Sequence, residues 1–380
     1  MMEYGSLDTS RTQRTLTGSA RLLMALHLDG PLFIALCLIA GIGVTVVFSA
    51  SGRSLLVLEA QVMRFGLAVI AMIMLAQIPP RVIRAATPWV YVLGLMLLAV
   101  VMFTGDIAMG AQRWLDLGVL RFQPSEIMKL AVPLACAWYL NERPLPPSLT
   151  SLLVVGLAVL VPTVIIAEQP DLGTALLVAA AGAMVILLAG LPLRFIAVVI
   201  GLLIPTCYVA WQFLLHEYQK QRVLTFLDPQ TDPLGSGYHI IQSQIAIGSG
   251  GVFGKGYLNG SQAQLEFLPE RSTDFIFAVI GEEWGLIGLV TVLGLYMFVI
   301  GRSLYLAAES QDTFSRLGAG SLALTFSVYV FVNAGMVTGL LPVVGVPLPL
   351  ISYGGTSMVT LMAGFGILMS LCAKRKLVGR

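Results

Sequence analysis

The hydrophobic residues of this chain fall into long uninterrupted blocks, separated by short polar segments. A helix needs about 20 apolar residues to cross the hydrocarbon core of a bilayer. The blocks match this length and predict about ten spans. They cover residues 31–50, 60–79, 86–104, 124–140, 150–167, 172–190, 194–215, 275–301, 317–341 and 355–373. The pattern therefore predicts an all-α polytopic membrane protein.

The positions of lysine and arginine predict the orientation, because short cytoplasmic loops of membrane proteins are enriched in both. With the N-terminus inside, most basic residues fall on the cytoplasmic side, including Arg81, Arg143 and Arg302. The short outer loops hold only Arg53, Arg64, Arg113 and Arg121. We therefore expect both termini in the cytoplasm. A tail of residues 1–30 precedes a membrane domain of residues 31–373, and a basic tail of residues 374–380 follows it.

One connection, at about residues 216–274 on the outer side, is much longer than the others. It is too polar to contain another span. A structureless loop of this length is uncommon unless it has a function. Its alternating segment 238–247 predicts short amphipathic helices lying on the membrane surface.

Composition supports this class of protein and excludes others. Hydrophobic residues make up 57% of the chain and charged residues 11%, whereas soluble domains carry roughly a quarter charged residues. The net charge of +2 gives no indication of nucleic-acid binding. The four cysteines lie in or at the end of apolar blocks without paired spacing, so neither a disulfide framework nor a zinc site is expected.

Charged residues inside or beside the spans are the candidates for chemistry, because a charge in the membrane is costly and usually functional. Glu126 and Lys129 are three residues apart and share one helix face. They are either an ion pair with a snorkelling lysine or a pair facing an outer cavity. Arg113, beside Gln112 and Trp114, either anchors the chain at the interface or binds an anion.

Asp274 lies where the long loop meets the eighth span. We expect Ser272 or Thr273 to cap that helix, which places Asp274 in its first turn. There it either complements the helix dipole or acts as a base at the lipid–water boundary. Glu282 and Glu283 follow about 12 Å along the helix and are expected to be interfacial.

The connection between the last two spans, residues 341–357, is rich in proline and glycine and cannot be a continuous helix. Irregular backbone at membrane depth is tolerated only against protein or a wet cavity. We therefore expect a re-entrant outer loop that walls a site.

These segments together resemble the SEDS family, the shape, elongation, division and sporulation proteins. The resemblance covers about residues 30–375. It is closest to the elongation member, with the division paralogue as the alternative. Ser272 departs from the pattern, because many relatives carry histidine there. The segments that carry the resemblance are 110–114, 123–129, 169–174, 267–277 and 347–357.

The resemblance implies a peptidoglycan glycosyltransferase of the bacterial cytoplasmic (inner) membrane, which polymerises lipid II on the outer face. It assigns the family's essential aspartate to Asp274, its cavity charges to Glu126 and Lys129, and its arginine to Arg113. We assign substrate binding to Gln112, Ser352, Tyr353, Thr356 and Ser357 as well. The implied partners are elongation-complex proteins and a class B penicillin-binding protein of the penicillin-binding protein 2 type, a transpeptidase contacted through transmembrane helices.

A chemical hypothesis follows from these assignments. A sugar hydroxyl of one lipid II attacks the anomeric carbon of another, and Asp274 takes its proton or positions it. Lys129 and Arg113 neutralise the departing pyrophosphate, and Glu126 orients Lys129. A divalent cation, Mg or Mn, on the pyrophosphate is compatible with this chemistry, but the sequence offers no dedicated oxygen cage.

Two other functions use the same residues. A flippase or transporter of a lipid-linked precursor would need a similar cavity, although transporters bind near the midplane, whereas these candidates cluster at the outer boundary. A non-catalytic scaffold for the transpeptidase would need none of the chemistry of Asp274.

Overall fold

The computed structural model describes residues 26–373. Within that range it leaves out residues 109–110, 117–120, 192–196, 198–200, 202–204, 206–207, 215–216, 232–235, 266 and 269. Helices match every predicted span except 194–215, much of which lies outside the described residues; a π-helical turn, Ala210–Leu214, is described there. The matching helices are α2 (Gly30–Ala50), α3 (Leu55–Gln77), α4 (Pro80–Thr104), α5 (Pro124–Asn141), α6 (Leu149–Glu168), α7 (Leu172–Leu188), α12 (Ile276–Ala308), α13 (Thr313–Thr338) and α14 (Thr356–Cys372).

In the described part of the chain, six helices are long and apolar enough to cross a membrane, namely α2, α3, α4, α6, α12 and α13. Helices α7 and α14 are apolar but only 17 residues long. Capping side chains explain several helix starts. The carboxylates of Asp29, Asp171 and Asp312 accept hydrogen bonds from backbone N–H groups in the first turns of α2, α7 and α13. Helix α13 ends at Gly339, which has the left-handed conformation that favours glycine.

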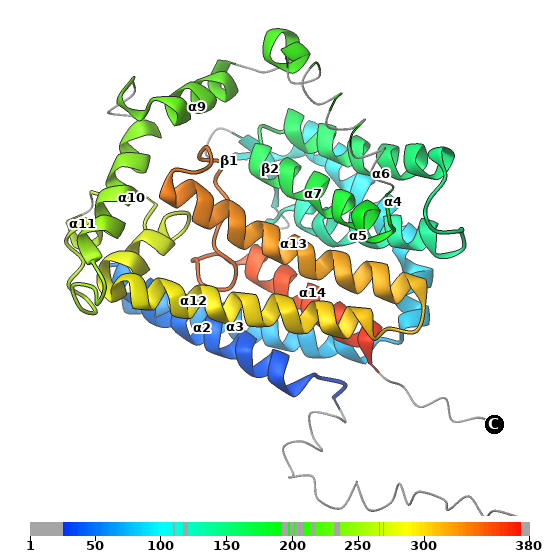
Figure 1. Ribbon diagram of the computed structural model, residues 1–380, viewed down its shortest axis with the longest axis horizontal. Coiled ribbons are helices and arrows are strands. Elements are labelled where there is room, and N and C mark those ends of the chain that lie inside the picture. Colours follow the sequence, from blue (N-terminus) through cyan, green and yellow to red (C-terminus); the bar gives the residue numbers. More distant parts are fainter. Residues whose placement is uncertain are drawn as a thin grey trace, which may run out of the picture.

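Helix α13 lies at the centre of the bundle and packs against α5, α7, α12 and α14 (Figure 1). We call one end of the bundle the loop end. It contains the ends of α2, α4, α6 and α13 and the starts of α3, α5, α7, α12 and α14. The start of α2 and the end of α14 meet at the opposite end. The helix termini that carry Arg81, Arg143, Arg302 and Arg316 lie at that opposite end as well, so the basic residues share a side as predicted.

The long connection forms short helices, as predicted. They are α9 (Glu217–Leu227), a 3-10 turn (Pro229–Thr231), α10 (Ser236–Gly250) and α11 (Ser261–Gln264). Helix α10 packs on protein, against α12 and α13. The buried Ser243 hydroxyl donates to the Val337 carbonyl of α13 at 2.8 Å. The long connection therefore belongs in part to the bundle, where the sequence predicted only a surface segment.

A small antiparallel sheet lies between α4 and α5, which the all-α prediction did not include. Its strands are β1 (Asp106–Ala108), β2 (Ala111–Asp116) and β3 (Arg121–Phe122), in the order β1-β2-β3. The pattern of long apolar blocks carries no information about strands this short. The sheet matters because β2 carries Arg113 to the loop end.

Helix α12 is broken at Gly285, whose backbone angles of φ 66° and ψ −160° are open essentially only to glycine. The break removes two intrahelical hydrogen bonds, those that would join Leu286 to Glu282 and Ile287 to Glu283. Segment 251–256 supplies new partners for all four backbone groups. The carbonyls of Glu282 and Glu283 accept from the N–H groups of Lys255 and Gly256, both at 3.0 Å. The N–H groups of Leu286 and Ile287 donate to the carbonyls of Gly251 and Val252. Segment 251–256 therefore holds together the two parts of α12 on either side of the break, and we call this segment the splint.

Glu282 and Glu283, which the sequence predicted at the depth of the membrane interface, are buried within the protein, and their depth in a membrane stays a prediction. Their exposed fractions are 0% and 1%, because segment 255–262 packs on them and α2 contacts Glu283. Glu282 Oε1 accepts from Lys255 Nζ at 2.7 Å, and also from the Ser261 hydroxyl and the Gln262 N–H. Glu283 accepts a hydrogen bond from Ser49 of α2. These carboxylates fix the position of the first part of α12, which follows Asp274.

Candidate active site

Asp274 lies in a turn, residues 270–275, directly before α12. The predicted cap is wrong, since α12 begins at Ile276 after Phe275 with no side-chain cap. The Thr273 hydroxyl donates to Glu270 Oε2 at 2.8 Å instead. The Glu270 carbonyl accepts from the N–H groups of Thr273 and Phe275, which closes the turn. Asp274 therefore lies on a tight turn, two residues before the first residue of α12, and not in the first turn of the helix as predicted.

Two hydrogen bonds join this turn to the connection between α13 and α14, and a third joins it to α13. The Ser352 hydroxyl donates to the Thr273 carbonyl at 2.5 Å and accepts from the Leu348 N–H at 2.7 Å. The Tyr353 N–H donates to the Ser272 carbonyl at 2.8 Å. Asn333 of α13 donates from Nδ2 to the carbonyl of Asp274, also at 2.8 Å. The backbone that carries Asp274 is therefore held on several sides.

The connection 339–355 contains no helix, as predicted, and it packs against protein. Its Gly345 has φ 74°, in the left-handed region, and a Cβ built there would lie 3.4 Å from Asp274 Oδ2. Asn333 Nδ2 also donates to the Val346 carbonyl at 2.8 Å. The Asp274 carboxylate therefore faces this connection; that the connection walls a substrate site stays a prediction.

Glu126 and Lys129 form the expected ion pair, with Lys129 Nζ 2.8 Å from Glu126 Oε1. Only 4% of Glu126 and 5% of Lys129 is exposed, which excludes a lysine that snorkels to the interface. Lys129 Nζ also lies 5.4 Å from the ring centroid of Tyr329. Among the described residues, Glu126 Oε2 has no hydrogen-bond partner. Lys129, Tyr329 and Thr360 line a cavity of about 30 Å³, enough for one or two waters.

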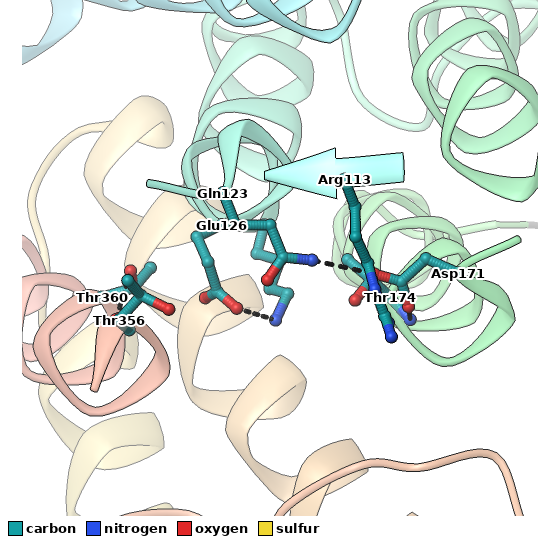
Figure 2. A network of polar contacts seen from close by, with 8 residues as sticks. Arg113, Gln123, Glu126, Asp171, Thr174, Thr356 and Thr360 are labelled. Atoms are coloured by element: carbon teal, nitrogen blue, oxygen red, sulfur yellow. Dashed lines mark hydrogen bonds and ion pairs between the residues drawn. The ribbon is translucent and has the colours of Figure 1, made fainter. Parts of the chain in front are cut away.

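A third polar group lies beside this pair and centres on Asp171 (Figure 2). Gln123 Nε2 donates to Asp171 Oδ2 at 2.8 Å, and Arg113 NH1 lies 3.6 Å from the same oxygen. Asp171 Oδ1 accepts from the Thr174 N–H and caps α7. Arg113 thus meets a buried carboxylate, so it does more than anchor the chain at the interface.

Sequence reasoning missed Asp171 and Gln123 as site residues. A polar run, Gln169 to Asp171, between two apolar spans was the available indication of the first. Gln123 stands directly before the fourth predicted span, in the segment 123–129. Neither position by itself indicates that its side chain meets Arg113.

Helices α13 and α7 connect the three polar groups, which are the turn of Asp274, the Glu126–Lys129 pair and the group around Asp171. Tyr329 and Asn333 are four residues apart, so they lie on one face of α13. Tyr329 contacts Lys129, and Asn333 donates a hydrogen bond to the backbone of Asp274. On α7, a Cβ at Gly173 would lie 2.6 Å from the Val344 carbonyl. The connection that faces Asp274 therefore contacts α7 at Gly173, which follows Asp171 by two positions in the chain.

The other predicted substrate-binding residues divide into three classes. Thr356 of α14 lies on the side of Glu126, together with Thr360, which the sequence did not predict as a site residue (Figure 2), and Ser357 is half-buried in the same first turn of α14. Ser352 is buried, and its hydroxyl is used to hold backbone. The side chain of Gln112 lies outside the described residues. Among the described residues, no group of three His, Cys, Asp or Glu is placed to hold a metal ion.

Comparison with known proteins identifies relatives over almost the whole chain. Residues 30–377 match the FTSW_RODA_SPOVE family model, described as cell cycle protein. The chain is 51% identical over 354 residues to peptidoglycan glycosyltransferase MrdB of Escherichia coli K12, covering 93% of this chain and 96% of that protein.

Two solved structures share the fold. One, from work on the structural coordination of polymerization and crosslinking by a peptidoglycan synthase complex, is 35% identical with a TM-score of 0.80, covering 92% of this chain and 98% of that one. The other is rod shape determining protein RodA of Thermus thermophilus, 30% identical with a TM-score of 0.70, covering 92% and 97% of the two chains.

Proposed function

The chain belongs to the FtsW, RodA and SpoVE family of cell cycle proteins, and we propose that it is a peptidoglycan glycosyltransferase of the elongation type. It polymerises lipid II into glycan strands, with lipid II as both donor and acceptor. Relatives named for this activity and for rod shape support the assignment. The observation that carries the site is that the Asp274 carboxylate faces the connection 339–355, whose Val346 packs with Tyr329 of α13 and Leu177 of α7.

In the proposed reaction, Asp274 accepts the proton of the attacking sugar hydroxyl as the new glycosidic bond forms. The anomeric carbon–oxygen bond to pyrophosphate breaks at the same centre, and the pyrophosphate leaves with the bonding electrons. A positioned base of this kind contributes roughly 10²–10⁴-fold in rate. Lys129 and Arg113 stabilise the leaving group, and Glu126 and Asp171 hold the two cations in place.

Ser352 and Asn333 have positioning roles in this proposal. Neither side chain needs to touch substrate, because each already holds the backbone around Asp274. Tyr353, Thr356 and Ser357 remain candidates for contact with the substrate. The prenyl chains lie against apolar grooves between helices. One such groove, between α3, α4, α5 and α14, has a volume of about 360 Å³ and an almost wholly apolar lining.

We further propose that the loop end is the outer face of the bacterial cytoplasmic membrane, with both termini in the cytoplasm and about ten spans in all. The segregation of basic residues to the opposite end supports this orientation. A partner of the class B penicillin-binding protein type fits the similarity to a synthase complex that couples polymerization to crosslinking. Cysteine labelling of Arg53→Cys and Arg316→Cys in intact cells tests the orientation, because only the first should react with an impermeant reagent.

The direct test uses purified protein, with its partner, incubated with lipid II. Wild type should yield glycan strands, and Asp274→Asn should lower the rate by at least 10²-fold. Asp228→Asn, which changes an exposed carboxylate of the long connection, should keep the normal rate. Polymer from Asp274→Asn at the wild-type rate would overturn the catalytic role of Asp274.

The same preparation separates the rival functions. A flippase would move labelled lipid II across a vesicle membrane without polymerising it, and a scaffold would do neither. Depletion in a rod-shaped host distinguishes elongation from division. Loss of an elongation enzyme gives round cells, whereas loss of the division paralogue gives filaments.

A further inference from the structure

Arg64 lies on α3 at the loop end, next to the connection that walls the site. It shares a helix face with Gln61, whose Nε2 donates to the Ser352 carbonyl at 3.3 Å. The Arg64 guanidinium carbon lies 4.3 Å from the centroid of the Tyr353 ring. Its Nε is 3.4 Å from the position of a Cβ built on Gly355. Arg64 is therefore oriented by an aromatic platform, with backbone beside it.

The electrostatic surroundings of Arg64 differ from those of three other basic residues. Arg113 lies next to Asp171, Lys129 next to Glu126, and Lys255 next to Glu282. Arg64 has no carboxylate partner among the described residues, and its NH1 is buried without a hydrogen-bond partner there. A guanidinium stays charged in proteins, and a buried donor without a partner costs free energy. An anionic group of a bound ligand would supply the missing partner of this guanidinium.

Arg64 is also close to the proposed chemistry. Its platform, Tyr353, donates its N–H to the carbonyl of Ser272, two residues before Asp274. Helix α3 carries Arg64, whereas α5 carries Lys129 and β2 carries Arg113. Arg64, Lys129 and Arg113 thus come from three different elements.

We infer that Arg64 binds a phosphate of a lipid-linked substrate, in a subsite between α3 and the start of α14. This inference rests on the proposed function. That reaction brings together two lipid-linked molecules, each with its own pyrophosphate, so one set of cations is not enough. A guanidinium stacked on a ring keeps its N–H edge available for bidentate contact with phosphate.

The test measures polymerisation by the purified complex in nanodiscs of neutral phosphatidylcholine, over a range of lipid II concentrations. Arg64→Gln should raise KM for lipid II about tenfold to a hundredfold, the usual range for loss of a hydrogen bond to a charged group, and should change kcat less. Inhibition by a polyprenyl pyrophosphate should weaken by a similar factor. Arg64→Lys, which keeps the charge without the planar fork, should recover part of the loss.

The matched control is Arg53→Gln, which removes the same charge from an exposed position at the same end, and KM should change less than about twofold. Arg64→Gln with wild-type KM and inhibition, in a protein that still polymerises, overturns the subsite and leaves the proposed function intact. An effect that appears only when anionic phosphatidylglycerol is present also overturns it, because Arg64 then binds a membrane headgroup. If Arg64→Gln does not fold, Arg64→Lys decides: unchanged KM and inhibition refute the subsite. A wild-type complex that binds lipid II without polymerising it refutes the proposed function instead.

Discussion

Two lysine–glutamate pairs have nearly the same length and different surroundings, and only the first is buried on both sides. Lys129 Nζ lies 2.8 Å from Glu126, and Lys255 Nζ lies 2.7 Å from Glu282. The Glu282 oxygen in contact with Lys255 also accepts from Ser261 and from the Gln262 N–H. The second oxygen of Glu126 has no partner among the described residues, and a small cavity lies beside Lys129. We propose that the first pair receives a ligand, whereas the second pair joins segment 251–256 to α12.

The largest expected difference between the pairs is in activity. The double variant Glu126→Gln with Lys129→Met removes both charges together, so no uncompensated buried charge remains. We expect it to fold with a similar melting temperature and to lose about 10²–10³-fold in polymerisation rate. Glycan synthesis and thermal unfolding of the purified protein measure both effects. A folded double variant with wild-type activity would show that the first pair is only structural.

The second pair should show the opposite balance. Glu282→Ala removes the acceptor of Lys255, Ser261 and the Gln262 N–H, and we expect a loss of about 1–3 kcal/mol in stability. The activity of the protein that remains folded should fall far less than in the first pair. Glu59→Ala, on the exposed face of α3, is the control for loss of a carboxylate. An unchanged melting temperature for Glu282→Ala would contradict its role in the splint.

The break in α12 gives a sharper test of the splint. A Cβ at Gly285 would lie 2.3 Å from the Gly254 nitrogen and 2.6 Å from the Val252 carbonyl. Strain at such a backbone conformation costs about 1–3 kcal/mol, so Gly285→Ala should lower the melting temperature and separate segment 251–256 from α12. Gly294→Ala in the same helix meets no atom within 4 Å and should raise stability by up to about 1 kcal/mol. Equal melting temperatures for the two variants would show that α12 does not need the splint.

The smallest effect is expected at Ser352. Ser352→Ala leaves the Thr273 carbonyl and the Leu348 N–H without this hydroxyl, which costs about 1–3 kcal/mol if water does not replace it. We expect kcat to fall severalfold, with KM little changed, because Ser352 acts on the turn of Asp274 and not on substrate. Ser327→Ala, whose hydroxyl bonds only its own helix, should leave both constants unchanged. A rise in KM alone for Ser352→Ala would instead favour direct contact with substrate.

The sequence predicted the bundle well and its polar contacts poorly. Apolar blocks of bilayer length were enough to locate nearly every long helix, because burial in lipid or protein requires continuous hydrophobic sequence. Glu126 and Lys129 were paired correctly because helix geometry fixes neighbours three residues apart. The cap at Asp274 was wrong because Thr273 bonds Glu270 within the turn instead of capping α12. A choice between local hydrogen bonds of similar strength depends on the surrounding backbone.

The sequence alone determined the class of protein, its helices, the irregular connection before α14 and the candidate residues Asp274, Glu126, Lys129 and Arg113. Each of these follows from local patterns or from motifs carried by adjacent residues. Only the tertiary structure decided that Arg113 meets Asp171, that Glu282 is buried by Lys255, and that Arg64 stacks on Tyr353. Those pairs are separated by 58, 27 and 289 positions in the chain, so no helical or strand periodicity relates them. Packing of distant elements brings these residues together, and it also decides which buried charges are already satisfied.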